Sequence, residues 1–141
     1  MWVKDVMEKA VFVPPDATKR QLLSIAKKNP DTDIFLVVDK DKKFLGEITE
    51  DDLFVMLLPD DLYDDIGIQL GFDLERKFFA KTVKEVMLKH EITCNDDDDV
   101  MEVALTLVRE EVECIPVLDG KGKVVGVVNQ GTLLRHMKAA D

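Results

Sequence analysis

The sequence repeats itself with a spacing of 80 residues, and this repeat constrains the fold more than any other feature. The segment Val3–Met7 (Val-Lys-Asp-Val-Met) returns as Val83–Met87 (Val-Lys-Glu-Val-Met), and Phe44–Thr49 returns as Val124–Asn129. A supersecondary unit that occurs twice cannot bury its apolar face alone, so we expect the two copies to pack on each other. A cleft between paired copies is a favourable place for a small ligand.

Within each copy the hydrophobic pattern predicts the order strand, helix, strand, strand, helix. The helix starts are the clearest signals, because Thr18 and Gln21 have the spacing of a capping box, as do Asp99 and Glu102. In the first copy we expect strands at residues 11–13, 34–38 and 44–48, with helices over 18–28 and 49–57. In the second copy we expect strands at residues 91–94, 114–118 and 124–128, with helices over 99–108 and through Leu133, Leu134 and Met137.

These patterns predict an α/β (α+β) fold made of tandem β-α-β-β-α repeats with pseudo-two-fold symmetry. We place the first domain at residues 1–58, a connector at 59–81 and the second domain at 82–141. The connector begins with the acidic run 60–65 but later becomes too apolar for a free linker. We therefore expect part of it to pack as a helix, at a subunit interface for example.

Composition narrows the class of protein. The chain has 19 Lys and Arg against 29 Asp and Glu, a net charge of −10, which argues against a nucleic-acid partner. No apolar run reaches the roughly 20 residues of a membrane helix, and we expect a cytoplasmic protein without a membrane partner. The two cysteines, Cys94 and Cys114, lack metal-ligand spacing and are expected to be reduced and partly buried. Neither His90 nor His136 has an obvious nucleophile or orienting acid, so we expect no catalytic site and no enzyme activity.

The repeat resembles a tandem pair of cystathionine-β-synthase (CBS) domains. Each copy opens with Val-Lys-Asp/Glu-Val-Met and closes on Gly-x-hydrophobic-polar followed by a helix. Pro15–Thr18 is similar to the family's entry to its first helix, and Ile115–Asp119 to its core strand. The resemblance covers roughly residues 2–58 and 82–138. It implies a regulatory module that dimerises and often binds AMP, ADP, ATP or S-adenosylmethionine.

The resemblance also implies which residues bind the ligand. In the family, a Thr or Ser followed three residues later by Asp starts the second helix, and the Asp receives both ribose hydroxyls. Thr49 and Asp52 match this pattern, and a carboxylate with two acceptor oxygens suits a vicinal diol. The partner copy would complete the site through Thr82, Met87, Val112, Glu113, Cys114, Ile115 and Pro116.

A second pocket, completed by Thr32, Asp33 and Ile34, is expected to be weak or empty. Its ribose position holds Thr132 instead of Asp, three residues after Asn129. One hydroxyl cannot accept from two diol hydroxyls as a carboxylate can.

Simpler interpretations remain open for several of these residues. Thr49 and Asp52 both suit the first turn of a helix, so capping alone accounts for them. The acidic residues around the site disfavour a polyphosphate, and Lys89 and His90 are the only nearby basic residues for a phosphate. We interpret the run Asp96–Asp99 as an acidic helix cap rather than a metal site.

The sequence therefore favours a non-catalytic sensor of an adenosine-containing ligand, AMP, ADP, ATP or S-adenosylmethionine. It would form a homodimer, need no cofactor and signal to an unknown regulated protein through a change in the packing of its two copies. S-adenosylmethionine or a nucleoside monophosphate suits the acidic surroundings better than ATP. The alternatives are a ligand-free dimerisation scaffold and a Mg²⁺-responsive module that uses the acidic clusters.

Overall fold

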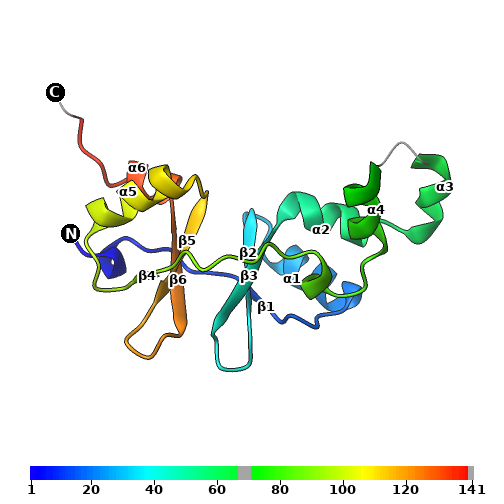
Figure 1. The fold of residues 1–141 in the computed structure, drawn as a ribbon, viewed down its shortest axis with the longest axis horizontal. Helices are drawn as coiled ribbons and strands as arrows, with labels where there is room; N and C mark the ends of the chain where they lie inside the picture. Colours follow the sequence, from blue (N-terminus) through cyan, green and yellow to red (C-terminus); the bar gives the residue numbers. More distant parts are fainter. Residues whose placement is uncertain (67–70, 140–141) are drawn as a thin grey trace. The chain divides into compact units, whose positions relative to one another are not determined.

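The computed structural model describes residues 1–66 and 71–139 (Figure 1). They form short 3-10 turns, helices and two three-stranded sheets. In chain order the elements are η1 (Val3–Asp5), β1 (Phe12–Val13), α1 (Lys19–Lys28), β2 (Ile34–Val38), β3 (Phe44–Thr49), α2 (Glu50–Leu57), η2 (Asp60–Leu62), α3 (Tyr63–Ile66), α4 (Gly71–Phe79), η4 (Val83–Glu85), β4 (Cys94–Asn95), α5 (Val100–Glu110), β5 (Cys114–Leu118), β6 (Val124–Asn129) and α6 (Gln130–Leu134). The mixed α/β class and the doubled strand-helix pattern predicted from the sequence are confirmed.

The chain forms two compact units that do not coincide with the two sequence repeats. Unit 1 comprises Met1–Ala10, Asp41–Phe44 and Glu91–Asp141, whereas unit 2 comprises Val11–Lys40 and Leu45–His90. The opening motif of each repeat therefore belongs to the unit that contains the strands and helices of the other repeat.

Unit 2 is built on the sheet β1-β2-β3, in which β1 runs parallel to the central strand β2. The strand β2 is almost entirely buried, as its unbroken apolar sequence predicts. Helix α1 starts at a complete Thr18–Gln21 capping box and packs near α2. The core beneath these helices contains Leu22, Phe35, Ile48, Met56 and, from the second repeat's opening motif, Val83 and Val86.

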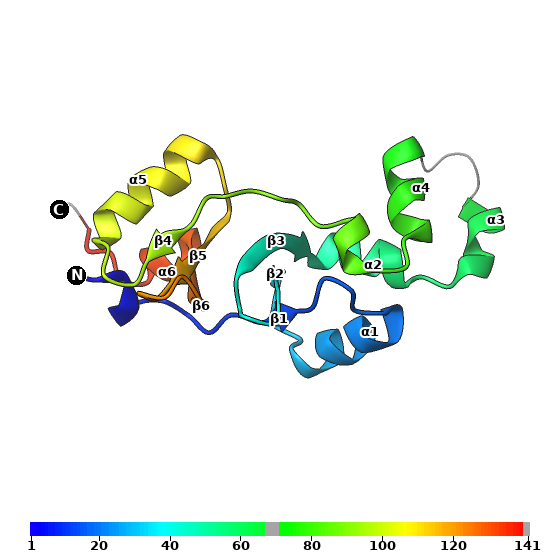
Figure 2. The ribbon, with the colours of Figure 1, turned by 60° about the horizontal axis from the view of Figure 1, so that its bottom comes forward.

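The connector supplies helices to unit 2. Helix α4 lies against α2 (Figure 2). Phe78 of α4 has no exposed surface, and the ring of Tyr63 lies 5.8 Å from it between centroids. Phe79 is 46% exposed. One face of this helix therefore belongs to the core and the other faces solvent. Of the apolar residues expected in the connector, Ile68 and Leu70 lie outside the described residues.

Unit 1 repeats the plan with the sheet β4-β5-β6. The strands β5 and β6 are antiparallel, with Cys114 opposite Asn129, and β4 is parallel to β5. Helices α5 and α6 pack near each other, and the core contains Val103, Ile115 and Val128. Val3 and Val6 of the first repeat's opening motif are buried in this same core.

The largest differences from the predicted element boundaries in unit 1 concern β4 and α6. The strand expected at residues 91–94 is instead Cys94–Asn95, with Cys94 opposite Val117. Continuing that register would set Thr93 opposite Pro116, whose nitrogen has no hydrogen to donate to a ladder. The last helix ends at Leu134 and does not reach Met137, which is 64% exposed. A short helix end without packing loses most of its stabilisation.

Both cysteines are reduced thiols and are buried. Burial in unit 1, followed by the charges of Asp98 and Asp96, raises the pKa of the Cys94 thiol to about 12. The thiolate is the reactive form, so a buried thiol with such a pKa is inert at neutral pH.

We expect Cys94 and Cys114 to resist labelling by a thiol reagent such as iodoacetamide at pH 8 in the folded protein and to react fully in urea. Because the pKa of Cys94 is raised on folding, its contribution to stability is complete below pH 9 and is lost as the pH rises towards 12. Rapid labelling of the native protein at pH 8, followed by mass spectrometry, would contradict the burial described here.

Candidate functional site

The end of the second opening motif pairs with strand β3 inside unit 2. Glu47 and Leu88 form an antiparallel bridge, with backbone N–H to O distances of 2.9 and 2.8 Å in the two directions. A Cβ added to Gly46 would lie 2.7 Å from the carbonyl oxygen of Leu88 and 3.1 Å from Sδ of Met87. The glycine of the Gly-x-hydrophobic-polar motif therefore permits this close approach, which brings Met87 next to the start of α2.

A pocket of about 260 Å³ opens beside this bridge, entirely within unit 2. It brings together three of the residues predicted to bind a ligand: Thr49, Asp52 and Met87. Its full lining is Glu47, Thr49, Asp52, Arg76, Lys77, Val86, Met87 and Leu88. The volume is slightly below the range of about 300–1,000 Å³ usual for small-molecule sites, so it suits part of a nucleotide-sized ligand.

Thr49 and Asp52 have different roles in the structure. Thr49 is the N-cap of α2, and its hydroxyl accepts a hydrogen bond from the backbone N–H of Asp52 at 3.2 Å. The carboxylate of Asp52 is not used in that cap. It instead accepts a hydrogen bond from Nζ of Lys77 at 2.9 Å, with the Asp52 side chain 27% exposed. Capping therefore accounts for Thr49 but not for the position of the Asp52 carboxylate.

Lys77 comes from connector helix α4 and lies between two acids. Its Nζ is 2.9 Å from Asp52 and 3.2 Å from Asp73, and its side chain is 17% exposed. The hydrogen bond to Asp52 is the main reason that the pKa of Lys77 is raised above its usual value, with Asp73 adding to it against the opposing effect of burial. The ammonium is thus firmly charged at neutral pH.

The prediction that Lys89 and His90 are the only basic residues near the site is wrong, because Arg76 and Lys77 line the pocket. Neither Lys89 nor His90 is among the lining residues, and Lys89 is exposed. His90 contacts the buried carboxylate of Glu47 through its Nε2. The i, i+3 and i+4 spacing of Asp73, Arg76 and Lys77 marks one helix face, but it does not indicate which pocket that face would meet.

Thr82 belongs to a helix cap and is not in the pocket lining. Together with Glu85 it forms a capping box for η4, in which its N–H donates to the Glu85 carboxylate at 2.8 Å and its hydroxyl at 3.0 Å. Hydrogen bonds from the backbone N–H groups of Thr82 and then Lys81 lower the pKa of Glu85 below its usual value. This cap fixes the start of the segment that ends at Met87.

The remaining nominated residues lie in unit 1. The segment from Val112 to Pro116, which includes Glu113, Cys114 and Ile115, leads into and begins β5. Cys114 and Ile115 are buried in that unit. A role for this segment in ligand binding stays a prediction.

The position equivalent to Asp52 in unit 1 is occupied by a closed cap. The side chain of Asn129 accepts from the N–H of Thr132 at 2.8 Å and from its hydroxyl at 3.1 Å. Thr132 is only 1% exposed. Thr32, Asp33 and Ile34 lie in unit 2, where the Asp33 carbonyl accepts from the N–H of Glu50. The satisfied, buried hydroxyl of Thr132 agrees with the expectation of a weak or empty second pocket, which stays a prediction.

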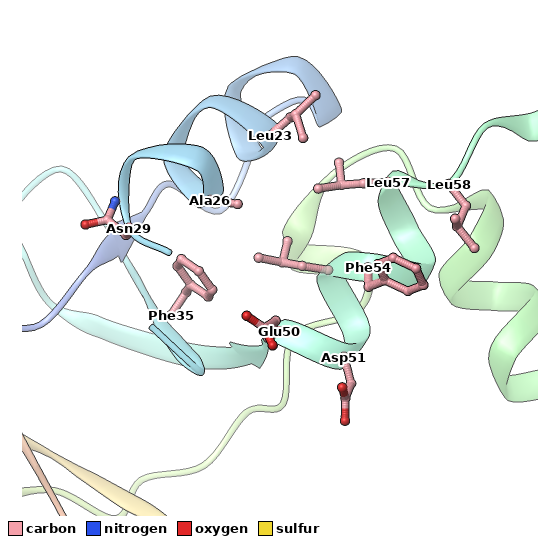
Figure 3. Close-up of a pocket in the computed structure, with 10 residues that line it drawn as sticks. Leu23, Ala26, Asn29, Phe35, Glu50, Asp51, Phe54, Leu57 and Leu58 are labelled. Carbon is pink, nitrogen blue, oxygen red and sulfur yellow. The ribbon is translucent and has the colours of Figure 1, made fainter. Parts of the chain in front are cut away.

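A larger groove of about 570 Å³ lies between α1 and α2 in unit 2. Figure 3 shows Leu23 and Ala26 of α1 on one side and Leu57 of α2 on the other, whereas Asp51 points away. Phe54, at its outer edge, is 66% exposed. The groove offers apolar surface and few polar groups, so its chemistry suits a protein side chain better than a nucleotide.

The acidic run before α5 acts in local turns. Asp99 caps α5 by accepting from the N–H of Met101 at 2.8 Å, and Asp98 accepts from the N–H of Asn95 at 2.9 Å. Across residues 1–66 and 71–139, no group of three or more His, Cys, Asp or Glu side chains is placed to hold a metal ion. In the same part of the chain, no helix has the length and apolar character needed to cross a membrane.

Known proteins share both the sequence pattern and the fold. The sequence profile of the CBS domain matches residues 3–58 and 83–139. Protein MJ1426 of Methanocaldococcus jannaschii is 26% identical over 97% of this chain and 91% of its own length. Protein MJ1004 of the same organism is 29% identical over 97% of this chain, which spans only 56% of that relative.

Solved structures agree with this assignment at the level of the fold. CBSX2 of Arabidopsis thaliana, solved in complex with AMP, has a TM-score of 0.73 and 21% identity, covering 96% of this chain and 94% of its own. The CBS domain pair of protein MJ0100, solved with 5′-methylthioadenosine and S-adenosyl-L-methionine, has a TM-score of 0.70 and 23% identity, with coverage of 96% and 94%.

The doubled sheet-and-helix units define a tandem-repeat protein with the CBS-pair fold. Since the profile matches both copies over most of the chain, the protein belongs to the CBS domain family.

Proposed function

We propose that this CBS pair is a non-catalytic regulatory module that binds an adenosine-containing ligand through the pocket at Asp52. The observation that carries the proposal is the position of the Asp52 carboxylate in a pocket with Thr49 and Met87. The Asp52 carboxylate takes no part in capping its helix, and its hydrogen bond from Lys77 leaves other lone pairs available to a ligand. Two relatives of similar fold were solved with AMP and with 5′-methylthioadenosine and S-adenosyl-L-methionine, which supports this class of ligand.

The pocket supplies groups suited to a nucleoside. A carboxylate accepts from both hydroxyls of a vicinal diol, and Met87 and Val86 offer apolar surface beside it. Four statements remain predictions from the sequence: the binding role of residues Val112 to Pro116, the homodimer, the cytoplasmic location and the regulated partner protein. The homodimer is supported by the apolar groove between α1 and α2, with Leu23 and Phe54 exposed at its edges.

The proposal is tested by thermal denaturation with AMP, ADP, ATP, S-adenosylmethionine and Mg²⁺, each added singly. A ligand at 100 times its dissociation constant should raise the free energy of unfolding by about 2.7 kcal/mol. We expect Asp52→Asn to remove most of the shift. The amide keeps one acceptor oxygen but replaces the other by a donor, so at least one hydrogen bond to a charged group is lost, about 1.5–3 kcal/mol or about 10- to 150-fold in affinity.

The matched control is Asp51→Asn, which removes the same charge from the neighbouring, exposed position on α2. Asp51 borders the α1–α2 groove with its side chain turned away from it, and it is not among the residues lining the Asp52 pocket (Figure 3). The Asp51→Asn variant should therefore retain the ligand-induced shift. If no adenosine compound stabilises the wild-type protein, or if both variants lose the shift equally, the proposed site is wrong.

One observation favours a second function. The exposed apolar groove between α1 and α2 suits a dimerisation or protein-interaction scaffold that needs no small ligand. The magnesium-responsive alternative has no such support among the described residues. The denaturation screen separates these functions, because a scaffold would show no stabilisation by any adenosine compound.

A further inference from the structure

Connector helix α4 places two cationic side chains in a site that the sequence motifs predict to be acidic. Lys77 and Arg76 line the pocket together with Asp52 and Glu47. The formal charges of these four side chains therefore balance. Glu50 and Asp51, which flank Asp52 in the sequence, line the other groove instead. Asp73, which contacts both cations, leaves this cluster with one negative charge. The two cations therefore weaken the electrostatic argument against an anionic ligand, which counted only the acids near the helix start.

The ammonium of Lys77 keeps donor capacity for a ligand. An ammonium carries three N–H donors, and the described residues provide two acceptors, Asp52 and Asp73. One donor is therefore left over. The side chain is held in place by both acids, so directing that donor to a ligand does not require the lysine to reorganise.

The ammonium of Lys77 and the carboxylate of Asp52 are in direct contact, and this limits the shape of a ligand that can bind to both. With Nζ of Lys77 only 2.9 Å from the Asp52 oxygen, a ligand that places a vicinal diol on Asp52 has its adjacent substituents within reach of Lys77. Arg76 is anchored to Asp73 at 3.2 Å and to the Glu85 carbonyl. It adds positive charge at the same wall of the pocket.

We propose that Lys77 of the connector helix is the specificity-determining residue of this pocket, selecting ligands that carry an anionic group next to a vicinal diol. A nucleoside monophosphate is then preferred over the neutral nucleoside. This inference rests on the proposed function, because it assigns a role to Lys77 in the same site.

Isothermal titration calorimetry with adenosine and AMP tests the inference through the ratio of their two affinities. We expect the wild-type protein to bind AMP more tightly than adenosine. Lys77→Gln should lower this AMP preference by about tenfold, the value of one charge-assisted hydrogen bond. The affinity for adenosine should change far less, and Lys77→Arg should restore most of the preference for AMP.

Two charge-matched controls separate a local effect from a change in net charge. Lys84→Gln removes the same charge from an exposed lysine of η4 outside the pocket lining and should leave the ratio unchanged. Lys89→Gln tests the residue that the sequence nominated for a phosphate. Urea denaturation of each variant confirms that it is folded at the titration temperature.

The outcomes are distinguishable. If the wild type binds both compounds and Lys77→Gln leaves their ratio unchanged, the role of Lys77 is wrong and the proposed function stands. A drop in the ratio for Lys89→Gln instead of Lys77→Gln would overturn the inference in favour of Lys89. If the wild type binds neither compound, the inference fails, and the denaturation screen with ADP, ATP and S-adenosylmethionine then decides the proposed function.

Discussion

Replacing Phe78 with alanine is expected to lower the free energy of unfolding by about 3–5 kcal/mol, the usual loss for a phenylalanine in a core. Phe78 has no exposed surface, although it belongs to the connector between the two repeats. Its ring contacts Phe79 at 5.1 Å and Tyr63 at 5.8 Å between centroids, and its helix packs on α2. Removing it leaves a cavity that these surrounding elements fill only in part.

The matched control is Phe79→Ala on the same helix. Phe79 is 46% exposed, so its loss removes less buried area and should cost about 1 kcal/mol. Urea denaturation followed by circular dichroism measures both variants. Equal midpoints for Phe78→Ala and Phe79→Ala would show that α4 is not an integral part of the unit 2 core, and the position of Lys77 beside Asp52 would lose its structural support.

Replacing Gly46 with alanine is expected to lower the free energy of unfolding by about 1–3 kcal/mol or more, as overpacking does in a close-packed site. The added Cβ would lie 2.7 Å from a backbone oxygen, that of Leu88. Neither β3 nor the segment at Leu88 can move away without lengthening the hydrogen bonds between Glu47 and Leu88. Because the same bridge positions Met87, the substitution should also weaken ligand binding.

Two other glycines serve as comparisons for Gly46. Gly126 lies beside the corresponding bridge of unit 1, between Glu8 and Val127. An added Cβ there would lie 2.8 Å from Sδ of Met7, the far part of a flexible side chain, and 3.0 Å from the backbone oxygen of Glu8. Because the backbone contact is longer than at Gly46, Gly126→Ala should be milder. At Gly120 nothing lies within 4 Å, and Gly120→Ala should be close to neutral. Denaturation midpoints that fall in a different order would contradict the close approach seen at the two bridges.

The elements with strong local signals were predictable from the sequence. The strands β2 and β5 are found at the expected residues, because each is a short apolar run covered on both sides. Helices α1 and α2 begin where Thr18 and Thr49 cap them. In each case a few neighbouring residues carry all the information, so no knowledge of the tertiary structure is needed.

The features that depend on distant contacts were not predictable. Val83 and Val86 are apolar whichever core contains them. The local sequence pattern therefore cannot predict that they are buried with the strands of the first repeat. Lys77 is an ordinary helix-face lysine until α4 packs on α2. The sequence thus indicated Thr49, Asp52 and Met87 through a motif, but the cations of the same pocket required the structure.

The exchange of opening motifs affects how the chain folds as it is synthesised. Domains tend to fold as units while the chain grows from its N-terminus. Here the strands of the first repeat leave the ribosome before Val83 and Val86, which complete their core, have been added. The burial of Val3 and Val6 is delayed further, because it requires β5 and β6, which are synthesised last. The nascent first repeat therefore exposes apolar surface for longer than an independently folding half would, and the acidic composition of the chain helps to keep that intermediate soluble.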